Sequence, residues 1–156
     1  MTRDEMRFLY RSDQGRIDRP AWWRAQAPLA VLLLALTLVW RLAEPYAHRS
    51  LAETQLIDAR AIAAYTYLIC YAFAALLLMV CSYCVSAKRF RDRGRPAGFA
   101  GIWPLAALLL GALVWTQPQD GGMFPLWIVQ AGAAGFAGIA AWSVYELGVA
   151  GEGAAR

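Results

Sequence analysis

Residues 87–101 read AKRFRDRGRPAGFAG, and this basic stretch decides how the rest of the chain is interpreted. It holds five basic side chains and one acid within eight positions, namely Lys88, Arg89, Arg91, Asp92, Arg93 and Arg95. Long apolar runs flank the stretch on both sides. A membrane protein has to place such a run where water and anionic headgroups lie, so the stretch fixes the orientation of its neighbouring spans.

The composition indicates a membrane protein rather than a soluble domain. Of the 156 residues, 60% are apolar and only 17% are charged. The charges gather in clusters that are separated by runs of about twenty residues, and such a run crosses a hydrocarbon core of roughly 30 Å. The net charge of +4 is modest. Because the bases lie between apolar runs, we expect anionic lipid as their counterpart, and no nucleic acid.

The sequence predicts an all-α, polytopic membrane protein with four transmembrane helices. Trp22 and Trp40 are eighteen residues apart. That separation corresponds to roughly 27 Å along a helix and matches the distance between two membrane interfaces. The whole chain, 1–156, is expected to form a single membrane domain. Its expected parts are an N-terminal segment, 1–20, spans at about 21–42, 61–87, 99–115 and 123–147, and a basic loop, 88–98.

The distribution of basic residues predicts that both termini are cytoplasmic. With four spans, the N-terminal segment, the basic loop and the C-terminus share one side of the membrane. Residues 1–24, the basic loop and the C-terminus hold six, five and one of the fifteen basic residues. The other side holds Arg41, Arg49 and Arg60. This is a strong positive-inside pattern, and it predicts a multi-pass membrane protein with this orientation.

The spans themselves carry few polar groups. Tyr71, nearest the middle of the second span, is expected to form a hydrogen bond within the bundle rather than face lipid. Cys81 and Cys84 form a C-x-x-C near the C-terminal end of that span, where the helix dipole disfavours a thiolate. We interpret them as packing residues. The sequence shows no catalytic constellation, so it predicts no enzyme activity, no cofactor and no metal site.

Small residues recur four positions apart in the fourth span. Such a face lets two helix backbones approach closely in lipid. We expect it to pack within the monomer, and the alternative is a seam between copies of the chain. The pairs are Ala131 and Gly135, Ala134 and Gly138, and Ala137 and Ala141.

Two motifs resemble those of a known family. Residues 15–23, GRIDRPAWW, are similar to G-R-x-x-R-x-x-[FYW]-W, and residues 88–94, KRFRDRG, are similar to [KR]-R-L-H-D-x-G. In this order they resemble the domain-of-unknown-function 805 family of small bacterial inner-membrane proteins, although Arg91 stands where that family usually has His. The resemblance implies a membrane location and no assigned activity. The matching residues are Gly15, Arg16, Arg19, Trp23, Arg89, Asp92 and Gly94.

We take these motif residues, with Lys88 and Arg91, as the candidate functional site, which either binds lipid headgroups or forms internal ion pairs. Arg16 and Arg19 are three positions apart and would share one face of a helical turn. Asp92 is the one acid in the basic run. We therefore hypothesise that Asp92 pairs with Arg16 or Arg19. The alternative is a run that only sets topology through solvated side chains.

The expected function is that of a non-enzymatic scaffold or interaction protein whose basic cytoplasmic face contacts anionic lipid. Its expected partners are the phospholipid bilayer and either a second copy of the chain or another membrane protein. The alternative is a small transporter or channel component that acts as an oligomer. Such a protein would need a polar path at mid-depth in the membrane.

Overall fold

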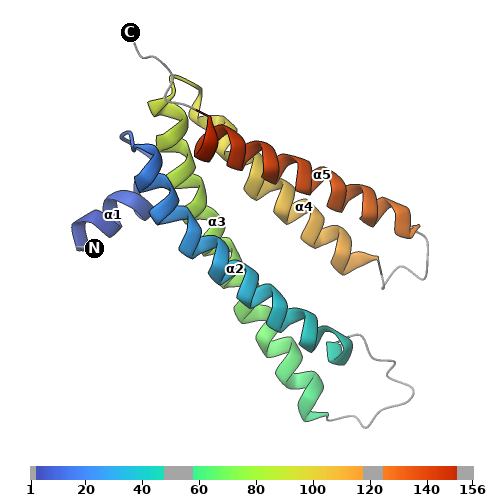
Figure 1. Cartoon of the computed structure of the whole chain (residues 1–156). Coiled ribbons are helices and arrows are strands. Elements are labelled where there is room, and N and C mark those ends of the chain that lie inside the picture. The colour runs from blue at the N-terminus through green and yellow to red at the C-terminus, as the bar shows by residue number, and fades with distance from the viewer. Residues whose placement is uncertain (1–2, 48–57, 118–124, 151–156) are drawn as a thin grey trace. The chain divides into compact units, whose positions relative to one another are not determined.

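The computed structural model describes residues 3–47, 58–117 and 125–150, and within these ranges it contains helices and no strand. Two of the elements are short: η1 is a 3-10 helix and η2 is a π-helical turn. Figure 1 shows the order of the elements along the chain. They are α1 (Arg3–Arg11), α2 (Arg19–Ala47), α3 (Ala59–Asp92), η1 (Ala97–Gly101), α4 (Ile102–Thr116), α5 (Leu126–Val144) and η2 (Tyr145–Val149).

Four helical segments are long and apolar enough to cross a membrane, which confirms the predicted all-α architecture with four candidate spans. They contain 29, 34, 20 and 24 residues. At about 1.5 Å per residue even the shortest reaches roughly 30 Å, the thickness of a hydrocarbon core. The segments are Arg19–Ala47, Ala59–Asp92, Ala97–Thr116 and Leu126–Val149. The expected start of the fourth span, at 123, lies outside the described residues.

Helix α3 continues through half of the stretch that we expected to be a loop. Residues 88–92 are helical, and the chain turns only at Gly94, whose φ is +70°. The Gly94 amide donates to the Arg91 carbonyl (3.0 Å) and the Arg95 amide to the Phe90 carbonyl (2.9 Å). This is the Schellman arrangement, in which a glycine in the left-handed region ends a helix. The motif glycine therefore has a backbone role.

The described chain divides into two compact units, and each is described by itself. One unit comprises residues 1–26 and 80–156, and the other comprises residues 27–79. Helices α2 and α3 contribute to both. The first unit contains both family-like motifs, so it holds the candidate site.

In the unit of residues 27–79, α2 and α3 are joined by hydroxyl and aromatic contacts. Thr37 donates to the Leu33 carbonyl, so the Tyr71 hydroxyl, 3.1 Å from Thr37 Oγ1, is the donor of that second bond. The Tyr67 hydroxyl donates to the Leu36 carbonyl (2.7 Å). The Trp40 ring stacks on Tyr71, with 6.4 Å between ring centroids. The predicted hydrogen bond of Tyr71 within the bundle is therefore confirmed.

Helices α4 and α5 lie side by side in the other unit (Figure 1). A Cβ on Gly132 would lie 3.0 Å from a Leu113 side-chain carbon, so a glycine allows this close approach. Gly132 was not among the small-residue pairs that the sequence suggested. Gly135 and Gly138, which were, have no described heavy atom within 4 Å of the point where a Cβ would lie.

The apolar core of the first unit gathers segments that are far apart in the sequence. It draws on α1, the segment after α1, the start of α2, the end of α3, η1 and η2. Phe90 and Trp142 add a ring stack at its edge, with centroids 6.0 Å apart. This core positions the charged residues described next. Its buried members are Leu9, Ile17, Trp22, Ala25, Val85, Ala87, Phe90, Ala100 and Leu147.

Candidate functional site: a buried charge cluster

The basic run and three acids form a charge cluster at the end of α3. The acids come from the segment after α1, from α3 itself and from η2. Five cations and three carboxylates therefore meet around the apolar core of this unit. The members of the charge cluster are Lys88, Arg89, Arg91, Asp92, Arg93, Arg95, Asp13 and Glu146.

Lys88 is fully buried and caps the end of another helix. Its ammonium donates to the carbonyls of Phe8 and Leu9, the latter at 3.0 Å, and lies 4.6 Å from the centre of the Phe8 ring. Both carbonyls belong to the last turn of α1, where backbone acceptors lack helical partners and the dipole favours a cation. Lys88 therefore fastens α1 to α3.

Arg89 is also fully buried. It pairs with Asp92, so the predicted pairing of Asp92 with Arg16 or Arg19 was wrong. Its Nε donates to the Leu147 carbonyl (3.2 Å), and its Nη1 pairs with the Asp92 carboxylate. Because α3 continues through Asp92, the acid lies one helical turn from Arg89 and reaches it without leaving the helix. Arg16 and Arg19 are exposed and make no ion pair with a described residue.

Arg91 makes the link that we had assigned to Asp92. Its guanidinium donates to both the carboxylate of Asp13 (2.9 Å) and the Asp13 carbonyl. The bond from Arg91 holds the pKa of the Asp13 carboxyl below its ordinary value, and the positive charge of Arg91 adds to this effect. The segment between α1 and α2 is thus tied to α3 by a charge-assisted pair.

Glu146 is the most enclosed acid of the charge cluster. Its side chain is 8% exposed, and its Oε1 lies 3.2 Å from Arg93 Nη1 and 3.1 Å from Arg95 Nε. Arg93 also donates to the Glu146 carbonyl. A carboxylate buried this far is retained only with close cationic partners. The sequence pattern marks Glu146 only as a charge near the end of a span.

Two tryptophans hold η2 against the start of α2. Trp23 Nε1 donates to the Gly148 carbonyl (3.1 Å), and a Cβ on Gly148 would lie 2.7 Å from the Trp23 ring and 2.9 Å from the Trp22 ring. Only a residue without a side chain allows this contact. Gly148, like Asp13 and Glu146, was missed because its role depends on residues far away in the sequence.

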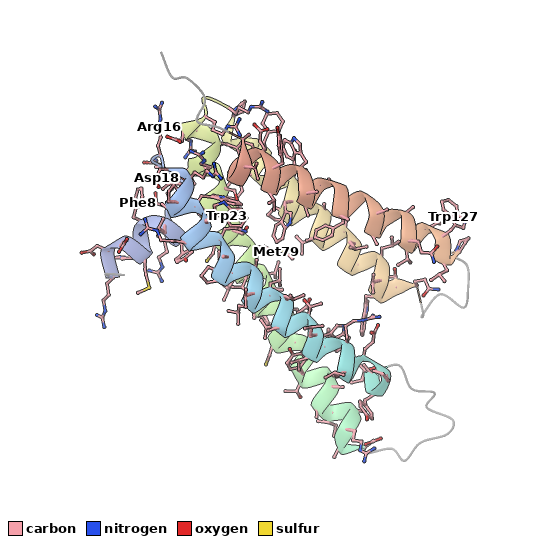
Figure 2. All side chains as sticks on the ribbon, in the orientation of Figure 1. Phe8, Arg16, Asp18, Trp23, Met79 and Trp127 are labelled. Carbon is pink, nitrogen blue, oxygen red and sulfur yellow. The ribbon has the colours of Figure 1, made fainter. Side chains whose placement is uncertain are left out.

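The first motif shapes the entry into α2. Gly15 has a φ of +102°, which a side chain would strain, and Ile17 is buried in the core. Asp18 Oδ1 accepts from the Ala21 amide (2.9 Å), so Asp18 is the N-cap. Figure 2 labels Arg16, Asp18 and Trp23 around this entry. Most of the motif is structural, and Arg16 and Arg19 are left on the surface.

Within the described ranges, no group of three or more His, Cys, Asp or Glu side chains is placed to hold a metal ion. Cys84 is buried and Cys81 is half-buried, and both are free thiols. These positions agree with our interpretation of the C-x-x-C as packing residues.

Comparisons with known proteins give one match. No curated protein and no solved structure matches the chain. A family profile described as "Protein of unknown function (DUF805)" matches residues 10–143, a range that contains both motifs and most of the charge cluster. The order of the motifs already resembled this family. The chain therefore belongs to the DUF805 family of proteins of unknown function.

Proposed function

We propose that this chain is a non-enzymatic scaffold or interaction protein of the bacterial inner membrane, with the charge cluster on the cytoplasmic side. The proposal is supported by the count of basic residues, because twelve of the fifteen would share one side if all four candidate helices cross the membrane. On that side the exposed arginines of the first motif contact anionic phospholipid headgroups.

The observation that carries the proposal is the division of the cations into two sets. Lys88 and Arg89 are fully buried, so they are committed to holding the chain together. Arg16 and Arg19 are exposed and without an ion pair among the described residues. They precede Trp23, a residue type that favours the membrane interface. An arginine near an anionic surface contributes about 1 kcal/mol of attraction.

The scaffold part of the proposal rests on the internal bonding of the charge cluster. Apart from the pair of Arg89 with Asp92, its contacts join residues that are 51 to 80 positions apart in the sequence, so they connect the N-terminal segment, the end of α3 and η2. A platform held by internal bonds presents Arg16 and Arg19 at fixed positions, as an interaction surface requires.

The alternative proposal, a transporter or channel component, would need polar groups that line a path at mid-depth. The Tyr71 hydroxyl instead bonds to Thr37, and Thr66 donates to the Ile62 carbonyl of its own helix (2.8 Å). These contacts leave both hydroxyl protons committed within the protein, which favours the scaffold.

Replacing both surface arginines, in Arg16→Gln with Arg19→Gln, should weaken the retention of anionic lipid roughly 30-fold, because two contributions of about 1 kcal/mol each are lost. The measurement is native mass spectrometry of protein released from nanodiscs that contain phosphatidylglycerol. Arg41→Gln, an exposed arginine on the other predicted side, is the matched control and should retain wild-type lipid. Unchanged phosphatidylglycerol retention in the double variant would contradict the proposal.

A further inference from the structure

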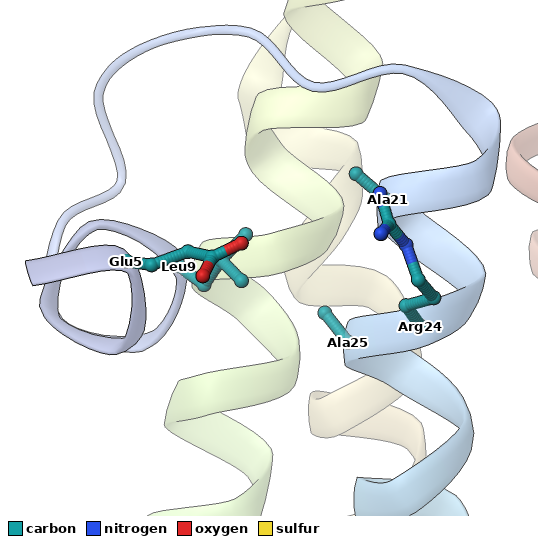
Figure 3. A pocket seen from close by; sticks show the side chains of 5 residues that line it. All are labelled: Glu5, Leu9, Ala21, Arg24 and Ala25. Atoms are coloured by element: carbon teal, nitrogen blue, oxygen red, sulfur yellow. The ribbon is translucent and has the colours of Figure 1, made fainter. Parts of the chain in front are cut away.

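Helix α1 crosses the first turns of α2 instead of running along them. In Figure 3, α1 is seen nearly along its axis, whereas α2 runs down the picture. Figure 1 likewise shows α1 projecting sideways from the start of α2. Residues 1–26 belong to one compact unit, so the mutual orientation of these two segments is defined. A helix that crosses a membrane span in this way runs along the membrane surface, as interfacial helices do.

Contacts at residues 8–10 hold α1 at a definite level of α2. The Tyr10 hydroxyl donates to the Ala25 carbonyl (3.2 Å), and Leu9 is buried in the same core as Trp22 and Ala25. Ala25 lies about 4.5 Å further along α2 than Trp22, a residue type that favours the membrane interface. If α2 crosses the membrane, the C-terminal end of α1 therefore lies within the interface and not above it.

The side of α1 that turns toward the membrane interior is apolar. Met6 and Tyr10 are four positions apart and share one face, and the bond from Tyr10 to Ala25 directs this face further along α2. Met6 is 44% exposed, so an apolar side chain on this face lacks a protein cover. Asp4 is also exposed and lies about 160° around the helix from Met6. The helix thus has an apolar and an acidic side.

Three arginines form a row along α1. Arg3, Arg7 and Arg11 are four positions apart, so neighbours in the row are about 6 Å apart along the helix. All three are exposed, and none makes an ion pair with a described residue. Arg7 lies about 160° from the buried Leu9, so the row points away from the core. Glu5 is not part of it, because Glu5 lines a small hollow with Leu9 on the side that faces α2 (Figure 3).

We propose that α1 is an interfacial helix in the headgroup layer, with Met6 at the edge of the acyl chains and the arginine row on the phosphates of anionic phospholipids. The inference rests on the membrane crossing of α2 that the proposed function assumes. An acidic segment of a soluble protein would also suit the row. The level of α1 beside Trp22 and the uncovered Met6 favour the lipid surface.

The depth of α1 is tested with spin labels on the full chain in nanodiscs of phosphatidylglycerol and phosphatidylcholine. The native thiols are removed in Cys70→Ala, Cys81→Ala and Cys84→Ala, and the label is attached to Met6→Cys or, as the matched control on the opposite side, to Asp4→Cys. Electron paramagnetic resonance compares collisions with oxygen, which dissolves in lipid, and with a nickel chelate, which stays in water. The ratio of oxygen to nickel collisions should be clearly higher for Met6→Cys than for Asp4→Cys.

The arginine row is tested in the chain with its native cysteines, by native mass spectrometry of protein released from the same nanodiscs. Arg3→Gln, Arg7→Gln and Arg11→Gln together should lower the retention of phosphatidylglycerol roughly 100-fold, because three contributions of about 1 kcal/mol each are lost. Asp4→Asn removes a repulsive charge beside the row and should raise this retention. Arg41→Gln, on the other predicted side, should leave it unchanged.

Either of two results overturns the inference. One is an equal ratio of collisions at the two labelled positions with both labels open to the nickel chelate, which would leave the row to an acidic protein segment in water. The other is wild-type retention of phosphatidylglycerol in the triple arginine variant. The proposed function fails separately, through Arg16→Gln with Arg19→Gln. If only that double variant behaved as the wild type, the lipid contact of the first motif would fall and the role of α1 would stand.

Discussion

Glu146→Gln is expected to lower the free energy of unfolding by about 3–5 kcal/mol, the usual cost of breaking a buried ion pair. The Glu146 side chain is only 8% exposed, and that of Arg93 is 11% exposed. An amide in place of the carboxylate would leave the Arg93 guanidinium with no anion in a poorly solvated site. The measurement is a denaturation series in mixed detergent micelles, followed by tryptophan fluorescence.

A matched pair elsewhere in the chain controls for the loss of a negative charge. Glu44 pairs with Arg41, whose side chain is 60% exposed, so Glu44→Gln should cost less than about 1 kcal/mol. Replacing both buried partners, in Arg93→Met with Glu146→Leu, should recover most of the lost stability, because neither charge is then left unpaired. If Glu146→Gln were as stable as Glu44→Gln, the charge cluster would not hold η2 in place.

Gly148→Ala is expected to lower the free energy of unfolding by about 1–3 kcal/mol, the cost of overpacking a filled site. The new Cβ would lie 2.7 Å from the Trp23 ring and 2.9 Å from the Trp22 ring. Both rings are large and have neighbours, so relief of the clash requires η2 to move. That movement would also break the bond from Trp23 to the Gly148 carbonyl. The same denaturation series measures the loss.

Gly135→Ala is the control for this second prediction. A Cβ at Gly135 meets no described heavy atom within 4 Å, and alanine favours a helix over glycine by up to about 1 kcal/mol. This variant should therefore be neutral or slightly stabilised. Equal behaviour of the two alanine variants would show that the contact between η2 and the tryptophans does not contribute to stability.

The architecture was predictable because it depends on local composition. Apolar runs of about twenty residues need no partner to be recognised, and each corresponds to one of the four long helices. The hydrogen bond of Tyr71 was predictable for a similar reason, because a hydroxyl at mid-depth needs an acceptor wherever the other helices lie.

The partners of the charged residues were not predictable in the same way. Asp92 was assigned to another segment because residues 88–98 were expected to form a loop, and in a helix Asp92 reaches Arg89 directly. Asp13 and Glu146 are 78 and 53 residues away from Arg91 and Arg93 along the chain. Nothing in the local pattern around either acid distinguishes it from a solvated surface charge, so only the folded structure reveals these pairs.

The motif residues also include some whose roles follow from residue type and some whose roles depend on distant partners. Gly94 matched the family motif by its type, and its positive φ shows the backbone role that a glycine has at this helix end. Lys88 was expected in a headgroup site or an ion-pair cluster, with a solvated base as the alternative, and it is fully buried. Its acceptors are backbone carbonyls at the end of α1. Every residue has such a carbonyl, so the sequence does not show which ones Lys88 contacts.

The central claim, that the basic run begins with buried rather than solvated cations, is tested most directly by amine labelling of Lys88, the only lysine of the sequence. Arg16→Lys adds an exposed lysine to the same protein as an internal reference. In nanodiscs and in detergent, an amine-reactive reagent followed by peptide mass spectrometry should modify Lys88 at least about tenfold more slowly than the introduced lysine, because Lys88 must first be exposed by local opening. Labelling of the two lysines at equal rates would contradict the buried charge cluster.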